Sequence, residues 1–311
     1  ITVEEDRNLN IATSDADNTI CSSDAITFTG QNFQPGDTFR WLLNSLPIGG
    51  ATNFVYNAPA GSLPNGAEVV FEATTPGGSC VYTASVTINV ASDPIASIGT
   101  NASGNVICSG DSISITASPT GLSYSFSIGG VPANPALVAG NVLTTTGITT
   151  DTVVSVTVTN AAGCSDTASL TVLVPYIISA GDISDPAATI CPGDVQPQIS
   201  SASLAVAAGA SGAATMTYQW QYKVGAAAWQ DIAGQTSSVL SAGTFNVVQT
   251  TSFRRLALAV FNGVSCDATP SSTVTITVEE DRNLNIATSD ADNTICSSDA
   301  ITFTGQNFQP G

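Results

Sequence analysis

Short runs of alternating apolar and polar residues recur along the whole chain. The clearest are residues 67–75 (AEVVFEATT), 151–160 (DTVVSVTVTN) and 253–262 (FRRLALAVFN). A period of two places successive side chains on opposite faces, which is typical of β-strands with one buried face. Residues that favour turns, chiefly Gly and Pro, separate the runs, and we find no convincing amphipathic helix. The pattern predicts an all-β chain of short strands.

A strand of the form aromatic-x-aromatic occurs three times. The pairs are Phe39 and Trp41, Tyr124 and Phe126, and Tyr218 and Trp220. Alternation places both rings of a pair on one face, where we expect them to fill a core. The alternative is an exposed platform on which a sugar stacks. About five to seven short strands in each stretch of about 80–110 residues predict β-sandwiches of the immunoglobulin type.

The first 36 residues return letter for letter as residues 276–311, at an offset of 275. A copy at a fixed period is the signature of a repeat array. We interpret the chain as one 275-residue repeat followed by the start of the next. Short linkers, such as SDP at residues 92–94, predict that the modules form an extended rod.

Cysteines mark three modules within the repeat. Three leading cysteines each follow an isoleucine and precede an aspartate by three positions: Cys21, Cys108 and Cys191. Three trailing cysteines each follow a Gly-containing turn and precede a final alternating run: Cys80, Cys164 and Cys266. The predicted boundaries are residues 1–7 for the last strand of a preceding module, 8–92, 93–174 and 175–283 for modules 1 to 3, and 284–311 for the next copy of module 1.

This recurrence predicts disulfides and therefore an oxidising compartment. We expect one bond inside each module, shielding that module from extension. The expected pairs are Cys21–Cys80, Cys108–Cys164 and Cys191–Cys266. Cys296 repeats Cys21, so its partner should lie beyond residue 311.

Composition narrows the function classes. The 24 acidic and 6 basic residues give a net charge of −18, which disfavours nucleic acid and anionic membranes as partners. No apolar run reaches the roughly 18 residues of a membrane span. Histidine is absent, which removes Ser-His-Asp and Cys-His catalysis. We predict a protein that is not an enzyme and has no cofactor.

Acidic residues gather where the third module meets the first. They are Glu279, Glu280, Asp281, Asp290 and Asp292, which repeat Glu4, Glu5, Asp6, Asp15 and Asp17. Carboxylate oxygens between tandem sandwiches suit calcium. The alternative is an acidic linker in contact with solvent, because the Asp15-x-Asp17-Asn18 sequence lacks the full spacing of a calcium loop.

Several motifs resemble tandem immunoglobulin-like and PKD-like repeats of giant cell-surface and gliding-adhesin-like proteins of the Bacteroidetes type. They are ICSGDSISITA at residues 107–117, VTNAAGC at 158–164 and TYQWQYKVGAAAWQDIAGQTSSVL at 217–240. The resemblance implies an extracellular, cell-surface stalk. It also implies O-glycosylation at Asp-Ser/Thr motifs, with Ser112, Thr152 and Thr167 as the candidate residues.

The sequence thus favours a structural repeat of a long extracellular filament or surface stalk. Its expected partners are further copies in the same chain and neighbouring chains in a bundle. One alternative is an adhesin or glycan-binding array, in which repetition gives avidity for a surface ligand. Another is a pilus-like polymer of separate subunits joined by strand donation.

Overall fold

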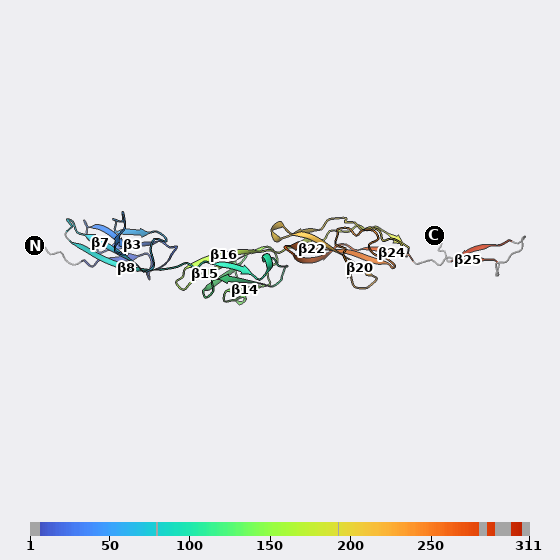
Figure 1. Ribbon diagram of the computed structural model, residues 1–311, viewed down its shortest axis with the longest axis horizontal. Helices are drawn as coiled ribbons and strands as arrows, with labels where there is room; N and C mark the ends of the chain where they lie inside the picture. Colours follow the sequence, from blue (N-terminus) through green and yellow to red (C-terminus); the bar gives the residue numbers. More distant parts are fainter. Residues whose placement is uncertain (1–6, 79, 192, 280–284, 290–299, 307–311) are drawn as a thin grey trace. The chain divides into compact units, whose positions relative to one another are not determined.

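The computed structural model describes residues 7–78, 80–191, 193–279, 285–289 and 300–306 (Figure 1). In this part, all regular elements are β-strands except three short 3₁₀ turns, and no helix is long and apolar enough to cross a membrane. The chain divides into two compact units. The first comprises Ile1–Asn105, Ser112–Gly147 and Thr152–Val172, and the second comprises Val106–Asp111, Ile148–Asp151 and Leu173–Gly311.

The first sandwich, in the first unit, has two sheets with strand orders β1-β3-β6 and β2-β8-β7-β4-β5. Its strands are β1 (Asn10–Thr13), β2 (Thr19–Cys21), β3 (Ile26–Gln31), β4 (Thr38–Leu43), β5 (Leu46–Pro47), β6 (Val55–Ala58), β7 (Ala67–Thr74) and β8 (Val81–Ala91). β1, β3 and β6 match strands A, B and E of the immunoglobulin fold, and β4, β7 and β8 match C, F and G. β2 pairs in parallel with β8.

Aromatic rings from both sheets fill the core of this sandwich. Trp41 on β4 is fully buried, with its ring centroid 6.0 Å from that of Phe28 on β3 and 4.8 Å from that of Phe71 on β7. Its indole N–H donates to the carbonyl of Asn53 at 2.7 Å. Gly30 leaves room for this packing, because an added Cβ would lie 2.3 Å from the Phe71 ring.

The second sandwich, also in the first unit, repeats this order with sheets β13-β14-β10-β9 and β12-β11-β15-β16. Its elements are β9 (Ser97–Thr100), η1 (Ser103–Asn105), β10 (Ile113–Ser118), β11 (Ser123–Ile128), β12 (Val131–Pro132), η2 (Pro135–Leu137), β13 (Val138–Ala139), β14 (Val142–Thr145), β15 (Thr152–Thr159) and β16 (Ser165–Val172). Buried Val156 on β15 lies opposite buried Phe126 on β11.

The loop after the first strand is built in the same way in the first two sandwiches. Thr13 Oγ1 lies 2.9 Å from Asn18 Oδ1, and 87 positions later Thr100 Oγ1 lies 3.0 Å from Asn105 Oδ1. Both asparagines adopt positive φ angles, 59° and 60°. Asparagine tolerates this left-handed conformation better than most residues. The two sandwiches therefore align position by position up to their leading cysteines.

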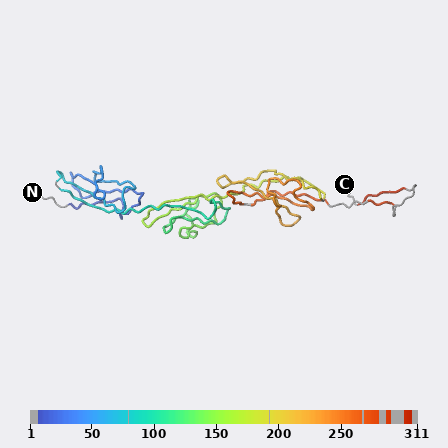
Figure 2. The backbone as a smooth tube through the Cα atoms, in the orientation of Figure 1, coloured from blue at the N-terminus to red at the C-terminus, as the bar shows by residue number. Residues whose placement is uncertain are grey.

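The third sandwich, in the second unit, has sheets β17-β19 and β18-β24-β22-β20-β21, with β23 also paired to β22. Its backbone is the yellow-to-orange part of the tube in Figure 2. Its elements are β17 (Tyr176–Ser179), β18 (Thr189–Ile190), β19 (Val206–Ala208), η3 (Ala210–Gly212), β20 (Thr215–Val224), β21 (Gln230–Asp231), β22 (Thr251–Phe261), β23 (Val264–Pro270) and β24 (Val274–Val278). Trp220, Phe253 and Leu240 are fully buried in its core.

A buried arginine distinguishes the third sandwich. The Arg255 side chain is 0% exposed and lies 4.5 Å above the Tyr218 ring. Its guanidinium donates to Ser201 Oγ, to the Ser238 carbonyl at 2.7 Å and to the Ala180 carbonyl at 3.3 Å. Burial lowers the pKa of Arg255 from its ordinary value, since the charged form is desolvated.

The described strands of the repeated residues form the same antiparallel pair in both copies. β25 (Asn285–Thr288) pairs with β26 (Phe303–Gln306), and Asn285 lies opposite Gln306. In the first copy, Asn10 lies opposite Gln31 on β1 and β3. The predicted class, an all-β chain of tandem immunoglobulin-like domains, is confirmed. The module boundaries and the extended rod stay predictions.

The second aromatic of each aromatic-x-aromatic strand is buried and the first is half-buried. The buried rings are Trp41, Phe126 and Trp220, and the half-buried rings are Phe39, Tyr124 and Tyr218. Buried rings cannot stack with a sugar. Each strand therefore lacks a pair of exposed rings on which a sugar could stack.

Candidate functional site at the module junctions

The three leading cysteines lie in the same capped turn. In each turn the cysteine N–H donates to the carboxylate of the aspartate three residues later, and the aspartate N–H donates to the cysteine carbonyl. The N–Oδ2 distances are 3.2 Å for Cys21 and Asp24, 3.2 Å for Cys108 and Asp111, and 2.9 Å for Cys191 and Asp194. The sequence motif Ile-Cys-x-x-Asp therefore fixes the local backbone that presents each thiol.

Each leading cysteine lies beside the end of the last strand of its own sandwich. Because β2 runs parallel to β8, Cys21 pairs with Ala91, the last residue of β8. Ile190, which precedes Cys191, likewise pairs with Val278 at the end of β24. The leading cysteine is thus at the end from which the chain leaves the sandwich.

The trailing cysteines of the first two sandwiches directly precede the last strand. Thr75 exchanges backbone and side-chain hydrogen bonds with Cys80 at 3.1 and 3.2 Å, which closes the turn before β8. Asn160 does the same with Cys164 at 2.9 and 3.0 Å, before β16. In the third sandwich, Cys266 lies on β23. The trailing cysteines of the first two sandwiches thus occupy equivalent turns.

Both disulfides join a leading cysteine to the trailing cysteine of the next predicted module. Cys21 bonds to Cys164 with a Cα–Cα distance of 5.5 Å, and Cys108 bonds to Cys266 with a Cα–Cα distance of 5.3 Å. Among the described cysteines, Cys80 and Cys191 are free. The predicted pairs Cys21–Cys80, Cys108–Cys164 and Cys191–Cys266 are therefore wrong. Cys296 lies outside the described residues.

Strand direction explains the correction. Cys80 precedes β8 and Cys21 pairs with its last residue, Ala91, so eleven residues of strand separate the two cysteines. At about 3.3 Å per residue this is about 36 Å, whereas a disulfide needs a Cα–Cα distance of about 4.4–6.8 Å. Alternation alone does not show which strands run parallel. The parallel pairing of the short β2 with β8 is the feature that sequence reasoning missed.

Hydrogen bonds accompany the bond between the first two modules. Ser22 Oγ donates to Asp93 Oδ2 at 2.5 Å, and Ser23 Oγ donates to Asp93 Oδ1 at 3.2 Å. The Cys21 and Cys164 sulfurs and the Asp93 carboxylate form a compact group. Because the two sulfurs are bonded to each other, they offer no thiolate to a metal, so the group is a structural joint.

The linker also contacts the turn that holds Cys164. The Asn160 side-chain amide donates to the Ser92 carbonyl at 3.0 Å, and the Ala96 N–H donates to Asp166 Oδ2 at 2.8 Å. The hydrogen bonds from Ala96 and from the backbone N–H of Thr167 lower the pKa of the Asp166 carboxyl group. Asp166, two residues after the trailing cysteine, thus anchors the incoming chain in its ionised form.

Asp151 organises the junction in the second unit. Its carboxylate accepts the backbone N–H groups of Val174 at 2.8 Å, Ala210 at 2.9 Å and Ser211 at 2.5 Å. Gly209 permits the close approach, since its φ is +80° and an added Cβ would lie 1.9 Å from the Val174 carbonyl oxygen. One carboxylate thereby ties Val174, the residue before Pro175, to the loop at 209–212.

The calcium candidates serve partly as backbone caps. Asp15 Oδ1 accepts the N–H groups of Asp17 and Thr19 at 3.2 and 3.1 Å, and Asp17 Oδ1 accepts the Thr19 N–H at 2.9 Å. Glu279 is exposed and its N–H donates to the Ile190 carbonyl at 3.0 Å. Calcium binding stays a prediction. The other candidates lie outside the described residues: Glu4, Glu5, Asp6, Glu280, Asp281, Asp290 and Asp292.

The glycosylation candidates differ in exposure. Ser112, which precedes β10, and Thr167 on β16 are exposed, whereas Thr152 on β15 is half-buried. A glycan needs a solvent-facing hydroxyl. Ser112 and Thr167 therefore suit modification better than Thr152, and the modification itself stays a prediction.

The strand order defines the class of the protein: tandem immunoglobulin-like β-sandwiches. A family profile described as "Domain of unknown function (DUF8696)" matches residues 179–280. A comparison with curated protein sequences finds no match.

Solved structures with a similar chain path share little sequence. Three N-terminal domains of the bacteriophage RB49 Highly Immunogenic Outer Capsid protein are 12% identical, with 88% of this chain and 100% of that chain covered and a TM-score of 0.45. The eight N-terminal Ig domains of Down Syndrome Cell Adhesion Molecule are 15% identical, covering 84% and 35%, with a TM-score of 0.42. A structure from a 1.5-MDa bacterial ice-binding adhesin is 14% identical, covering 90% and 100%, with a TM-score of 0.33.

Proposed function

We propose that this chain is a structural, non-catalytic repeat of a long extracellular filament or surface stalk. The observation that carries the proposal is that both disulfides, Cys21–Cys164 and Cys108–Cys266, join one module to the next. Such bonds hold successive modules together under load. Disulfides also suit an oxidising, extracellular setting.

The set of strands in each sandwich favours a continuous chain over a polymer of strand-donating subunits. Donor-strand assembly requires a sandwich that lacks one of its own strands. In the described residues, the first sandwich contains its own first and last strands, β1 and β8, and the second contains β9 and β16. An adhesin with repeated binding sites is the second candidate, and binding of a surface glycan by the oxidised chain would favour it.

A reducing, denaturing gel of the native material tests the proposal. A covalent array should give a band, ladder or smear at several times the 31.4 kDa of this chain. The same sample without reductant should migrate faster, because internal bonds keep the denatured chain compact. A single reduced band near 31 kDa would refute the array and favour separate subunits.

A further inference from the structure

Among the described cysteines, two thiols remain after the two disulfides are assigned: one leading cysteine and one trailing cysteine. Cys191 is a leading cysteine, and Cys80 is a trailing cysteine. The leading cysteines of modules 1 and 2 each bond to the trailing cysteine of the module that follows. Module 3 has no following module within the repeat, and module 1 has no preceding one. Their unused cysteines are the two that this rule leaves over.

We propose that Cys191 of one repeat forms a disulfide with Cys80 of the repeat that follows it in the same chain. The proposal rests on the array proposed above and adds a covalent link at its third-to-first junction. Each free thiol therefore bonds to a cysteine in the next or the previous copy of this repeat.

The spacing of the cysteines agrees with this link. The two observed bonds span 143 and 158 residues. Cys191 follows Cys80 by 111 residues, and the repeat period is 275, so the next copy of Cys80 follows Cys191 by 164 residues. The third span is thus close to the other two, as expected when each bond crosses one linker and one module.

The local geometry of Cys191 matches that of the bonded leading cysteines. It lies in the same capped turn, with its N–H 2.9 Å from Asp194 Oδ2, and its neighbour Ile190 pairs with the end of β24. The residue is exposed. Cys191 is therefore presented at the end of the third sandwich from which the chain continues to the next module.

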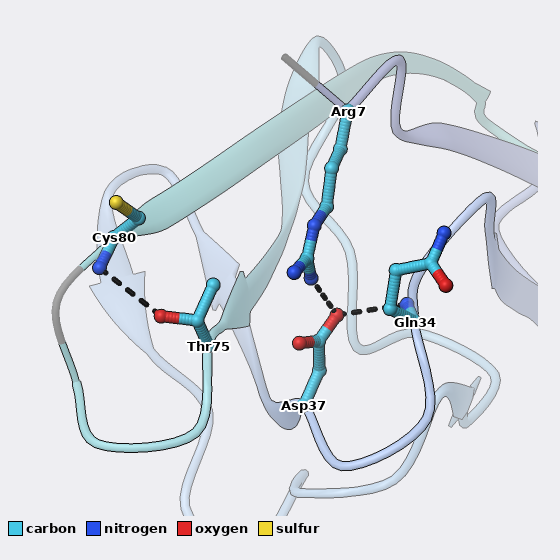
Figure 3. Close-up of polar contacts among 5 residues, drawn as sticks. All are labelled: Arg7, Gln34, Asp37, Thr75 and Cys80. Carbon is cyan, nitrogen blue, oxygen red and sulfur yellow. Dashed lines mark hydrogen bonds and ion pairs between the residues drawn. The ribbon is translucent and has the colours of Figure 1, made fainter. Parts of the chain in front are cut away.

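Cys80 is presented where a preceding module would attach. Arg7 forms an ion pair with Asp37 (Figure 3), and its guanidinium lies 5.0 Å from the ring centroid of Tyr82. Tyr82 follows Cys80 by two residues, as Asp166 follows Cys164. Each of the two contacts the chain that enters its sandwich, Tyr82 through Arg7 and Asp166 through Ala96. In Figure 3 the Cys80 sulfur points away from Thr75, the residue that closes its turn.

The bond requires a two-electron oxidant. The two thiols lose two protons and two electrons as the S–S bond forms, and a disulfide reagent such as oxidised glutathione accepts them and becomes two thiols. The consequence is topological. With two bonds per repeat, residues 267–295 lie outside every disulfide loop, whereas the third bond encloses them.

A chain of two complete repeats tests the proposal. We would extend this chain with a second copy of residues 37–275, replace the first-copy Cys80 and the second-copy Cys191 by serine, and insert a specific protease site between residues 279 and 285. The chain is oxidised with a glutathione buffer. A linked peptide containing Cys80 and Cys191, no free thiols in denaturant, and a single non-reduced band after cleavage are expected.

Two free thiols and two non-reduced bands after cleavage would overturn the proposal, provided that Cys21–Cys164 and Cys108–Cys266 peptides show that both copies folded. Bands at multiples of the chain mass would also overturn it, since the link would then join different chains. A matched variant with the first-copy Cys191→Ser should separate into two bands. None of these outcomes depends on the native array, so a single 31-kDa band from native material would refute only the proposed function.

Discussion

Pulling on the chain should reveal the route of its covalent connections. A chain unfolded by force extends only along its shortest covalent path. From Arg7 this path reaches Cys21, crosses to Cys164, runs backwards to Cys108, crosses to Cys266 and ends at residue 279. Its backbone segments of 14, 56 and 13 residues give 83 steps, against 272 in the reduced chain.

The extension follows from these counts. At about 3.4 Å per residue, the fully unfolded oxidised chain should reach about 280 Å and the reduced chain about 920 Å. Single-molecule force spectroscopy between residues 7 and 279, with and without reductant, measures this difference of about 640 Å. Equal final extensions in the two conditions would refute the disulfide assignment.

Single substitutions separate the observed pairing from bonds within modules. Cys21→Ser leaves a path of 114 steps, an increase of about 105 Å, whereas Cys80→Ser should change nothing. If Cys21 were bonded to Cys80, either substitution would release the same 59 residues, about 200 Å. Identical lengthening in the two variants would therefore contradict the reasoning.

Three further outcomes are expected. Asp151→Ala should lower the free energy of unfolding by about 2–3 kcal/mol in urea titrations, because three backbone N–H groups lose their acceptor; an unchanged midpoint would contradict this role. The pKa of Asp166 is lowered in the folded state, so its contact with Ala96 contributes stability above the unfolded-state pKa of about 3.9. This contribution is lost as the pH falls through the folded-state pKa. The protection factor of the Ala96 amide against hydrogen exchange, taken relative to the intrinsic rate at each pH, should fall on acidification, and Asp166→Asn should remove that pH dependence. Arg255→Ala should cost about 3 kcal/mol or more, and Arg255→Met less, since methionine fills the space without burying a charge; equal losses in thermal unfolding would refute that distinction.

Local sequence patterns were sufficient to predict the strands and the class of fold. The alternating run at residues 67–75 is β7, in which Ala67, Val69, Phe71 and Ala73 are buried. The described strands of the two copies pair in the same register, β1 with β3 and β25 with β26. These features depend on side-chain alternation over a few residues, which a sequence displays directly.

The disulfide pairing was not predictable by the same means. Spacing suggested that Cys21 pairs with Cys80, because they are neighbouring members of one module. The three-residue strand β2 decides otherwise, since its parallel pairing places Cys21 beside Ala91. Asp93 belongs to no motif and Asp151 only to the short Asp-Thr motif, and their structural roles appear only when Ser22 or Ser211 is brought beside them by the fold.

Disulfides across junctions protect the linkers that disulfides within modules would leave open to proteolytic cleavage. Linkers and loop tips are where proteolysis concentrates. Bonds within modules would leave residues 81–107 and 165–190 outside every loop, so one cut there would sever the chain. The observed loops overlap over residues 108–164, and a single backbone cut anywhere between Cys21 and Cys266 leaves the two parts joined. If Cys191 bonds to the next Cys80, every position along the array lies inside at least one disulfide loop, and no single cut, at a junction or within a module, then separates a long extracellular chain.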